Sequence, residues 1–147
     1  MTNLTASFLG DEATWRRARI SASSVHGLWG GYIISVGGDG AALICLIDPG
    51  QRERRYALAI GQPAAQGLLR RCVEHDLLAI DLPERASLVP DEAQVVIQLA
   101  AGRRGFSLTT WANDPPHAGL NDILTALLAL RQQTEGLAPV YDGLYSG

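Results

Sequence analysis

Two apolar segments joined by a glycine-rich turn constrain this chain most strongly, because together they predict a β-hairpin. Residues 32–36 and 41–47 are rich in strand-forming side chains, and the turn between them reads Gly37-Gly38-Asp39-Gly40. Glycine adopts positive φ without a steric penalty, and Asp-Gly is a favoured pair in tight turns. The second segment has no polar residue on either face, which indicates a strand that is central in its sheet or covered on both sides.

The spacing of apolar residues elsewhere predicts four more strands and two helices. A helical period over residues 63–75 and 114–136 predicts helices, the second with Asp114 as N-cap and Gly136 after its last turn. The resulting order, β-β-β-β-α-β-β-α, contains no βαβ unit. It predicts an α+β fold, with two helices packed on one face of an antiparallel sheet of about five to six strands. The additional strands are expected over residues 15–25, 56–60, 93–99 and 106–111.

Length and composition are those of one globular domain. The chain has 147 residues, of which 47% are hydrophobic and 18% charged, and this is enough to bury a single core. We expect the domain to span residues 14–136, between a flexible N-terminal arm (1–13) and a C-terminal tail (137–147). No stretch reads as a secretory signal or a membrane span, so we expect a cytoplasmic protein with Cys45 and Cys72 as reduced, buried thiols.

The charge pattern bears on the class of partner. A net charge of −3 and a pI near 5.5 argue against nucleic acid and against a membrane surface as partners. All twelve positive side chains are arginines, and their clusters lie at strand ends and turns, where charge discourages aggregation. The expected partner is therefore another protein or a second copy of this chain, as a homodimer.

Residue types that carry chemistry form no motif in this sequence. The turn 37–40 leads into a strand, whereas a phosphate-binding loop needs a helix behind it. Cys72 and His75 have the spacing of two metal ligands, but a structural zinc site needs four. We predict no catalytic residue, no metal ligand and no cofactor. The alternative is a small enzyme or a small-ligand-binding protein with a pocket near Trp29 and His26.

The last predicted hairpin supplies the candidate binding surface. If Val95, Ile97 and Leu108 face the helices, the residues between them face the opposite way. An aromatic side chain among amides and hydroxyls is typical of a protein-binding patch, and the other interpretation is that the termini cover this face. The candidate partner-binding residues are Gln94, Gln98, Thr109 and Trp111, with Trp29 and Tyr32 as an extension.

Several segments occur in an order that resembles a known family. They are Trp29-Gly30-Gly31-Tyr32, residues 68–83 with their Asp-Leu-Pro ending, Pro90-Asp91 and the hairpin at Gly102-Arg103-Arg104. This order is similar to that of the small bacterial emfourin domain, the protealysin inhibitor, over about residues 27–130. The chain departs from the family in its N-terminal arm and first strand, in residues 51–55 and in its tail, and no contact residue carries over.

Emfourins inhibit thermolysin-type metalloproteases, so the resemblance implies a protein-binding module, with protease inhibition as one option. Together with the candidate surface, it favours a non-enzymatic protein-interaction module over an enzyme. Such a module would act as a protease-inhibitor-like domain or as a subunit of a larger assembly.

Overall fold

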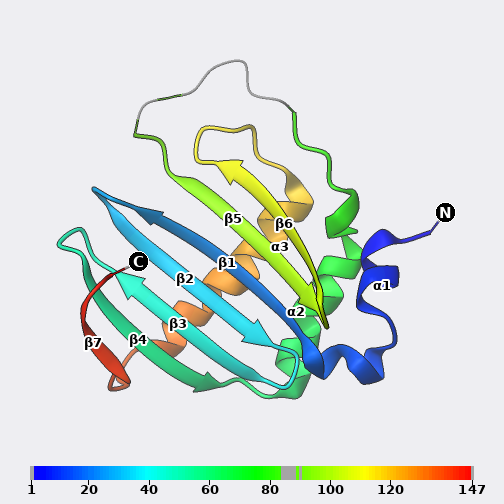
Figure 1. The fold of residues 1–147 in the computed structure, drawn as a ribbon, viewed down its shortest axis with the longest axis horizontal. Helices are drawn as coiled ribbons and strands as arrows, with labels where there is room; N and C mark the ends of the chain where they lie inside the picture. The colour runs from blue at the N-terminus through cyan, green and yellow to red at the C-terminus, as the bar shows by residue number, and fades with distance from the viewer. Residues whose placement is uncertain (1, 84–88, 90, 147) are drawn as a thin grey trace.

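A computed structural model describes residues 2–83, 89 and 91–146, and it confirms the predicted α+β class. Seven strands form one antiparallel sheet in the order β6-β5-β1-β2-β3-β4-β7 (Figure 1). The strands are β1 (Ala18–His26), β2 (Gly30–Gly37), β3 (Ala41–Ile47), β4 (Arg52–Ala59), β5 (Gln94–Ala101), β6 (Arg104–Trp111) and β7 (Tyr141–Leu144). The α-helices are α1 (Leu4–Leu9), α2 (Gln62–Glu74) and α3 (Ala118–Leu128). Short 3-10 helices lie at Glu12–Arg17, Leu77–Ala79 and Ala129–Thr134.

The sheet has one strand more than the upper end of the predicted range, because part of the expected tail pairs with it. Residues of β7 lie antiparallel to β4, with Tyr141 opposite Arg55. The N-terminal arm also differs from the expectation of a flexible segment. It contains α1, in which Thr5 is fully buried and Leu9 joins the core. Both segments are short and mixed in composition, so they carry no periodic signal of their own.

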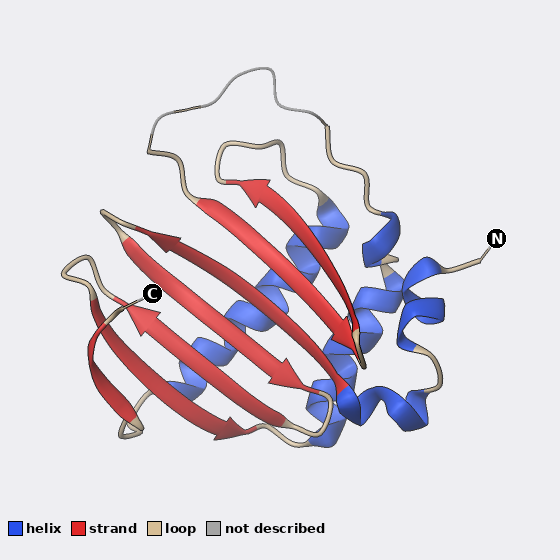
Figure 2. Cartoon of the chain, in the orientation of Figure 1, coloured by secondary structure: helices blue, strands red, loops and turns tan. Residues whose placement is uncertain are grey.

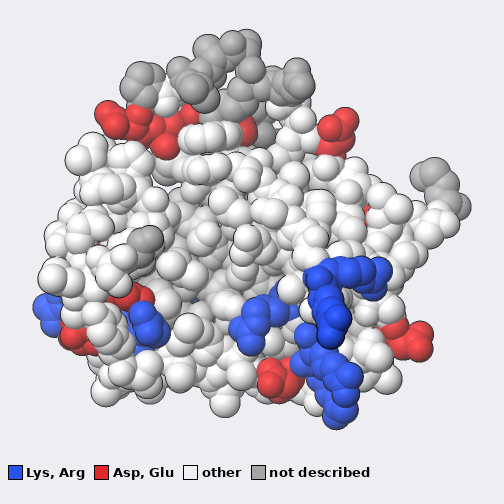
Figure 3. Space-filling view, viewed as in Figure 1, with Lys and Arg blue, Asp and Glu red and all other residues white. Residues whose placement is uncertain are grey.

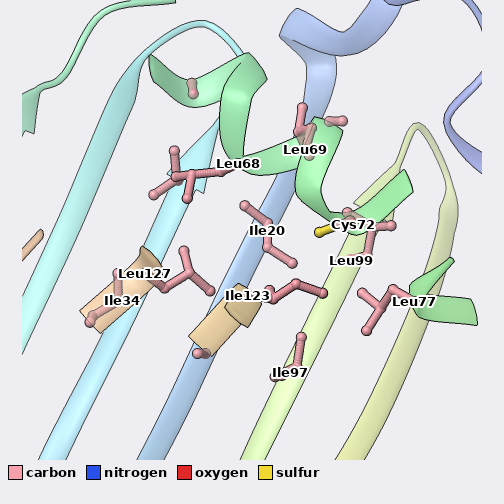
Figure 4. Close-up of a cluster of buried hydrophobic side chains, with 14 of the residues drawn as sticks. Ile20, Ile34, Leu68, Leu69, Cys72, Leu77, Ile97, Leu99, Ile123 and Leu127 are labelled. Atoms are coloured by element: carbon pink, nitrogen blue, oxygen red, sulfur yellow. The ribbon is translucent and has the colours of Figure 1, made fainter. Parts of the chain in front are cut away.

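Helices α2 and α3 lie side by side on one face of the sheet, and no helix of the described residues lies on the opposite face (Figure 2). Side chains from alternate positions of the central strands meet the apolar stripes of both helices (Figure 4). The largest fully buried side chains include Ile20, Ile34, Ile44, Leu69, Leu77, Ile97, Leu99, Ile123 and Leu127. Both helices bury their apolar stripes in this single core, which explains why they cover only one face of the sheet.

The hairpin β2–β3 forms as predicted, and β3 is a central strand. Its turn is closed by the Asp39 carboxylate, which accepts a hydrogen bond from the Ala41 N–H at 3.0 Å. Helices cover β3 on one side only. On the other side Leu43 is 38% exposed, so the apolar run does not mark a strand buried on both faces.

The last helix begins later than predicted. His117 caps α3, accepting a hydrogen bond from the Leu120 N–H at 3.2 Å, whereas Asp114 accepts one from the Trp111 N–H. Asp114 and Pro115 each precede a proline, and this position disfavours helical backbone. The helix therefore begins only at Ala118. The helical trace continues as the 3-10 helix Ala129–Thr134 and ends before Gly136.

Both cysteines are buried free thiols, and burial raises the pKa of Cys72 to about 12. Among the described residues, no helix combines the length and the apolar character needed to cross a membrane.

Candidate functional site

The candidate site is the sheet face opposite α2 and α3, which we call the open face. Alternation places every second residue of each strand on it, and the register aligns these residues into rows across the sheet. Figure 3 views this face and shows a broad area without charged side chains, interrupted by one basic group in its lower half, with the other charges towards the margin. One central row runs Thr109, Val96, Ser23, Ile33, Cys45, and the next runs Ser107, Gln98, Ser21, Ser35, Leu43.

Small and uncharged side chains dominate these rows, and most are neither buried nor fully exposed. Within the seven strands, charged side chains on the open face are confined to Arg19, Glu53 and Arg55. Arg19 donates a hydrogen bond to Ser35 Oγ at 2.8 Å. A partner that covers the middle of this face would therefore have to accommodate the Arg19 guanidinium but no other charged side chain of the central strands.

Four of the six predicted site residues lie together at the β5–β6 end of the open face. Gln94 is opposite Trp111, and Thr109 and Gln98 follow on the same face. Gln94 and Gln98 are exposed, and Trp111 is half-buried. The Trp111 backbone is fixed by Asp114, whose carboxylate accepts its N–H at 3.0 Å. Amide, hydroxyl and indole groups thus lie on one face of two neighbouring strands, with Val96 among them.

Tyr32 does not extend this surface. It points to the helix side and packs against the core, and the Arg131 guanidinium lies 5.8 Å from its ring centre. Alternation explains the difference, because Tyr32 has the same parity in β2 as the buried residues Ile34 and Val36. Burial is the main cause that raises the pKa of Tyr32, and the nearby Arg131 opposes it.

Trp29 and His26 lie at the loop between β1 and β2. Their rings stack with centres 6.0 Å apart, and His26 Nδ1 accepts a hydrogen bond from the Leu28 N–H. Trp29 is 64% exposed. The two rings pack against each other at the surface, and the His26 ring bonds to the backbone of its own turn. This arrangement does not favour the alternative of a ligand pocket near Trp29 and His26.

No protein-family model matches this chain, and no curated protein does so.

The opposite end of the open face holds a cluster that the sequence analysis missed. The Arg55 guanidinium pairs with the Glu53 carboxylate at 3.1 Å and lies 4.9 Å from the Tyr141 ring centre. Glu53 is only 4% exposed, and Cys45 beside it is buried. Burial is the largest cause of the raised pKa of the Cys45 thiol, and its hydrogen bond to Glu53 is the next largest. Glu53 and Arg55 are two residues apart, so the sequence predicts that both lie on one face of a strand. The sequence contains no signal for the approach of Tyr141.

This cluster makes a prediction about thiol reactivity. Arg55→Ala should expose Cys45 and speed its reaction with a thiol reagent by about tenfold or more, since access controls the reaction of a buried thiol. The measurement is the rate of absorbance change with a disulfide-exchange reagent under native conditions. Arg54→Ala is the matched control, because Arg54 lies on the other face of the same strand. An unchanged Cys45 rate in Arg55→Ala would contradict the arrangement.

Titratable groups also meet on the helix side. Asp122 accepts hydrogen bonds from Arg71 and contacts His75 Nε2 at 2.8 Å. The contact with His75 is the largest cause that lowers the pKa of Asp122, and Arg71 is the next. Cys72 is fully buried in the core, away from this surface cluster. Across the part of the chain that the structure describes, no three His, Cys, Asp or Glu side chains gather as a metal site would require.

Proposed function

We propose that this chain is a non-enzymatic protein-binding module that docks a partner protein on its open face. The observation that carries the proposal is the low charge in the middle of that face, bordered at its β5–β6 end by Gln94, Gln98, Thr109 and Trp111. The centres of protein interfaces contain few charged residues, and tryptophan is frequent among the residues that contribute most to binding. The resemblance to emfourin supports the same class of function.

Two glutamines provide a matched test of this surface. Gln98 lies exposed on the open face and Gln133 lies exposed on the opposite, helical side. Gln98→Arg should weaken partner binding by tenfold or more, which corresponds to about 1.4 kcal/mol, because it buries an unpaired charge in the interface. Gln133→Arg adds the same charge without touching that surface and should bind like the wild type.

The measurement is affinity capture from a bacterial lysate with the wild type and both variants, followed by titration of each captured protein. A partner retained by Gln133→Arg and lost by Gln98→Arg supports the proposal. Identical capture by all three proteins contradicts it. Equal melting temperatures of the three proteins show that the comparison reports on binding and not on unfolding.

The tryptophan makes a separate prediction. Trp111→Ala should weaken the complex by about 2 kcal/mol or more, because truncating an aromatic anchor removes most of its buried contact. The measurement is the dissociation constant for a captured partner, with thermal unfolding as the control. If Trp111→Ala melts far below the wild type at unchanged affinity, then Trp111 serves the core and not the partner.

Thermolysin-type metalloproteases are the first partner class to assay. We expect a molar excess of the chain to slow peptide hydrolysis by such a protease, and Gln98→Arg to relieve that inhibition. Hydrolysis that continues at the same rate at every concentration would remove protease inhibition and leave assembly with another protein as the function of the open face.

A further inference from the structure

Strand β6 is the first in the sheet order, so one of its two edges lies at the margin of the sheet. The Ala112 N–H donates to the Ala93 carbonyl oxygen at 2.9 Å, directly beyond the last β5–β6 pair. In an antiparallel ladder, residues alternate between bonding the neighbour and facing away from it. The register therefore turns the N–H and C=O groups of Gly105, Ser107 and Thr109 outward, away from β5.

Both ends of this outer edge are already closed by other parts of the chain. At one end the Trp111 N–H donates to Asp114 Oδ2, and the Trp111 carbonyl accepts from the Asp114 N–H, both at 3.0 Å. At the other end the Arg104 side chain donates to the Phe8 carbonyl oxygen in α1 at 2.6 Å. Between these points, β5 is the only strand of the described sheet that pairs with β6.

We propose that a second copy of this chain pairs with this edge, strand β6 antiparallel to strand β6, with Ser107 opposite Ser107. Ser107 is the central residue of the three that face outward, so this register uses all of them. Gly105 of each copy then lies opposite Thr109 of the other, and each such pair exchanges two backbone hydrogen bonds. The product is one continuous sheet made from two copies.

The side chains on the helix side fit the same register. It sets Phe106 of each copy opposite Leu108 of the other, and both residues are half-buried in the single chain. Beside Phe106 lies an apolar groove of about 310 Å³ between α1 and β6, lined by Leu4, Ser7, Phe8, Leu78, Arg104 and Phe106. Leu4 in that groove is 49% exposed. An added strand would direct its Leu108 toward this groove, which is how strand addition obtains specificity.

Charge complementarity favours a second copy over an unrelated extended peptide. Arg103 and Arg104 lie where β6 begins, whereas Asp114 and Glu92 lie where it ends. Figure 3 shows the largest basic group at the lower right, with acidic side chains beside it, and further acidic side chains along the top of the molecule. A two-fold axis at Ser107 brings the basic end of each copy to the acidic end of the other, so the pairing is self-complementary.

The test is the molar mass in solution, measured by light scattering across a dilution series. The wild type should approach twice the chain mass of 15.7 kDa at high concentration. Ser107→Pro removes the outward N–H without touching the β5 ladder, as edge strands allow. It should give the single-chain mass at concentrations where the wild type is dimeric. Ser107→Ala keeps the N–H and should stay dimeric. A wild type with single-chain mass throughout, or a Ser107→Pro variant that dimerises normally, overturns the proposal.

Amide hydrogen exchange of the wild type decides the question even if Ser107→Pro does not fold. The amides of Gly105, Ser107 and Thr109 should slow with rising protein concentration, while those of Phe106 and Leu108 stay slow throughout because they bond to β5. Fast exchange of the three outward amides at every concentration overturns the proposal. Gln98→Arg, on the open face, should leave the mass unchanged, so loss of partner binding and loss of the dimer are separately measurable.

Discussion

Gly31→Ala is expected to destabilise the protein by at least about 3 kcal/mol, since the mutation forces both backbone strain and a steric clash. Gly31 is the second residue of β2 and lies opposite Val25, and its φ of +150° is a conformation that residues with a Cβ rarely adopt. A Cβ at this position would lie 1.7 Å from the Ser24 carbonyl oxygen. That oxygen belongs to the backbone of β1, so relief requires the two strands to separate.

The matched control is Gly67→Ala, the same substitution at a position where the added methyl group is free. Gly67 lies inside α2, and a Cβ there would meet no atom within 4 Å. Because alanine favours helical backbone over glycine, this change should stabilise the protein by about 0.5–1 kcal/mol. Urea unfolding of the two variants and the wild type measures both effects. Equal stability of Gly31→Ala and the wild type would contradict the strand geometry at β1–β2.

Asp76→Ala should detach α1 and lower the free energy of unfolding by about 2–3 kcal/mol, because it leaves the buried polar groups of Thr5 without an acceptor. The Asp76 carboxylate accepts hydrogen bonds from the Thr5 N–H and Thr5 Oγ, both at 2.9 Å, and from the Leu4 N–H at 3.2 Å. Thr5 Oγ in turn accepts from the Leu78 N–H at 3.0 Å. Proteolysis near the N-terminus together with urea unfolding would measure the loss.

Asp76→Asn is the control, because asparagine tolerates the left-handed backbone that Asp76 adopts, with φ at +44°, and retains one acceptor oxygen. It should lie between the wild type and Asp76→Ala in stability. If Asp76→Ala unfolds at the same urea concentration as the wild type, the contact does not hold α1 in place.

The same carboxylate predicts a pH dependence. Burial alone would raise the pKa of Asp76, but the hydrogen bonds from Thr5 and Leu4 outweigh it and lower the pKa below its ordinary value. A group with a lowered folded pKa stabilises the fold above its unfolded pKa, about 4 for Asp, and this contribution disappears as the pH falls through the folded pKa. The wild type should therefore lose stability below about pH 4 more steeply than Asp76→Asn. Parallel curves for the two proteins would contradict this assignment.

A dimer through β6 and a partner on the open face are compatible with each other. The β6–β6 register continues the sheet, so the open faces of two copies would join across Ser107 and Thr109. The residues Gln98 and Trp111 of each copy would then lie near the middle of one larger surface. Binding through such a surface would gain from the presence of two equivalent copies.

Much of the fold could be predicted from local patterns. The hairpin at residues 32–47 follows from its turn chemistry, and helix α2 follows from the apolar stripe that its residues bury. The placement of Gln94, Gln98, Thr109 and Trp111 on one face follows from alternation in β5 and β6. The error at Tyr32 came from grouping aromatic residues by type, whereas its parity in β2 places it with Ile34.

The periodic elements follow from the order of the residues alone, because hydrophobic spacing and turn residues act over a few neighbouring positions. The folded chain alone reveals that α1 docks on Asp76, that β7 pairs with β4 and that Arg55 and Tyr141 meet over Cys45. Each of these joins residues far apart in the chain through one or two polar groups or a short strand. Such contacts leave no period in the sequence, since their geometry depends on where the folded core brings the segments together.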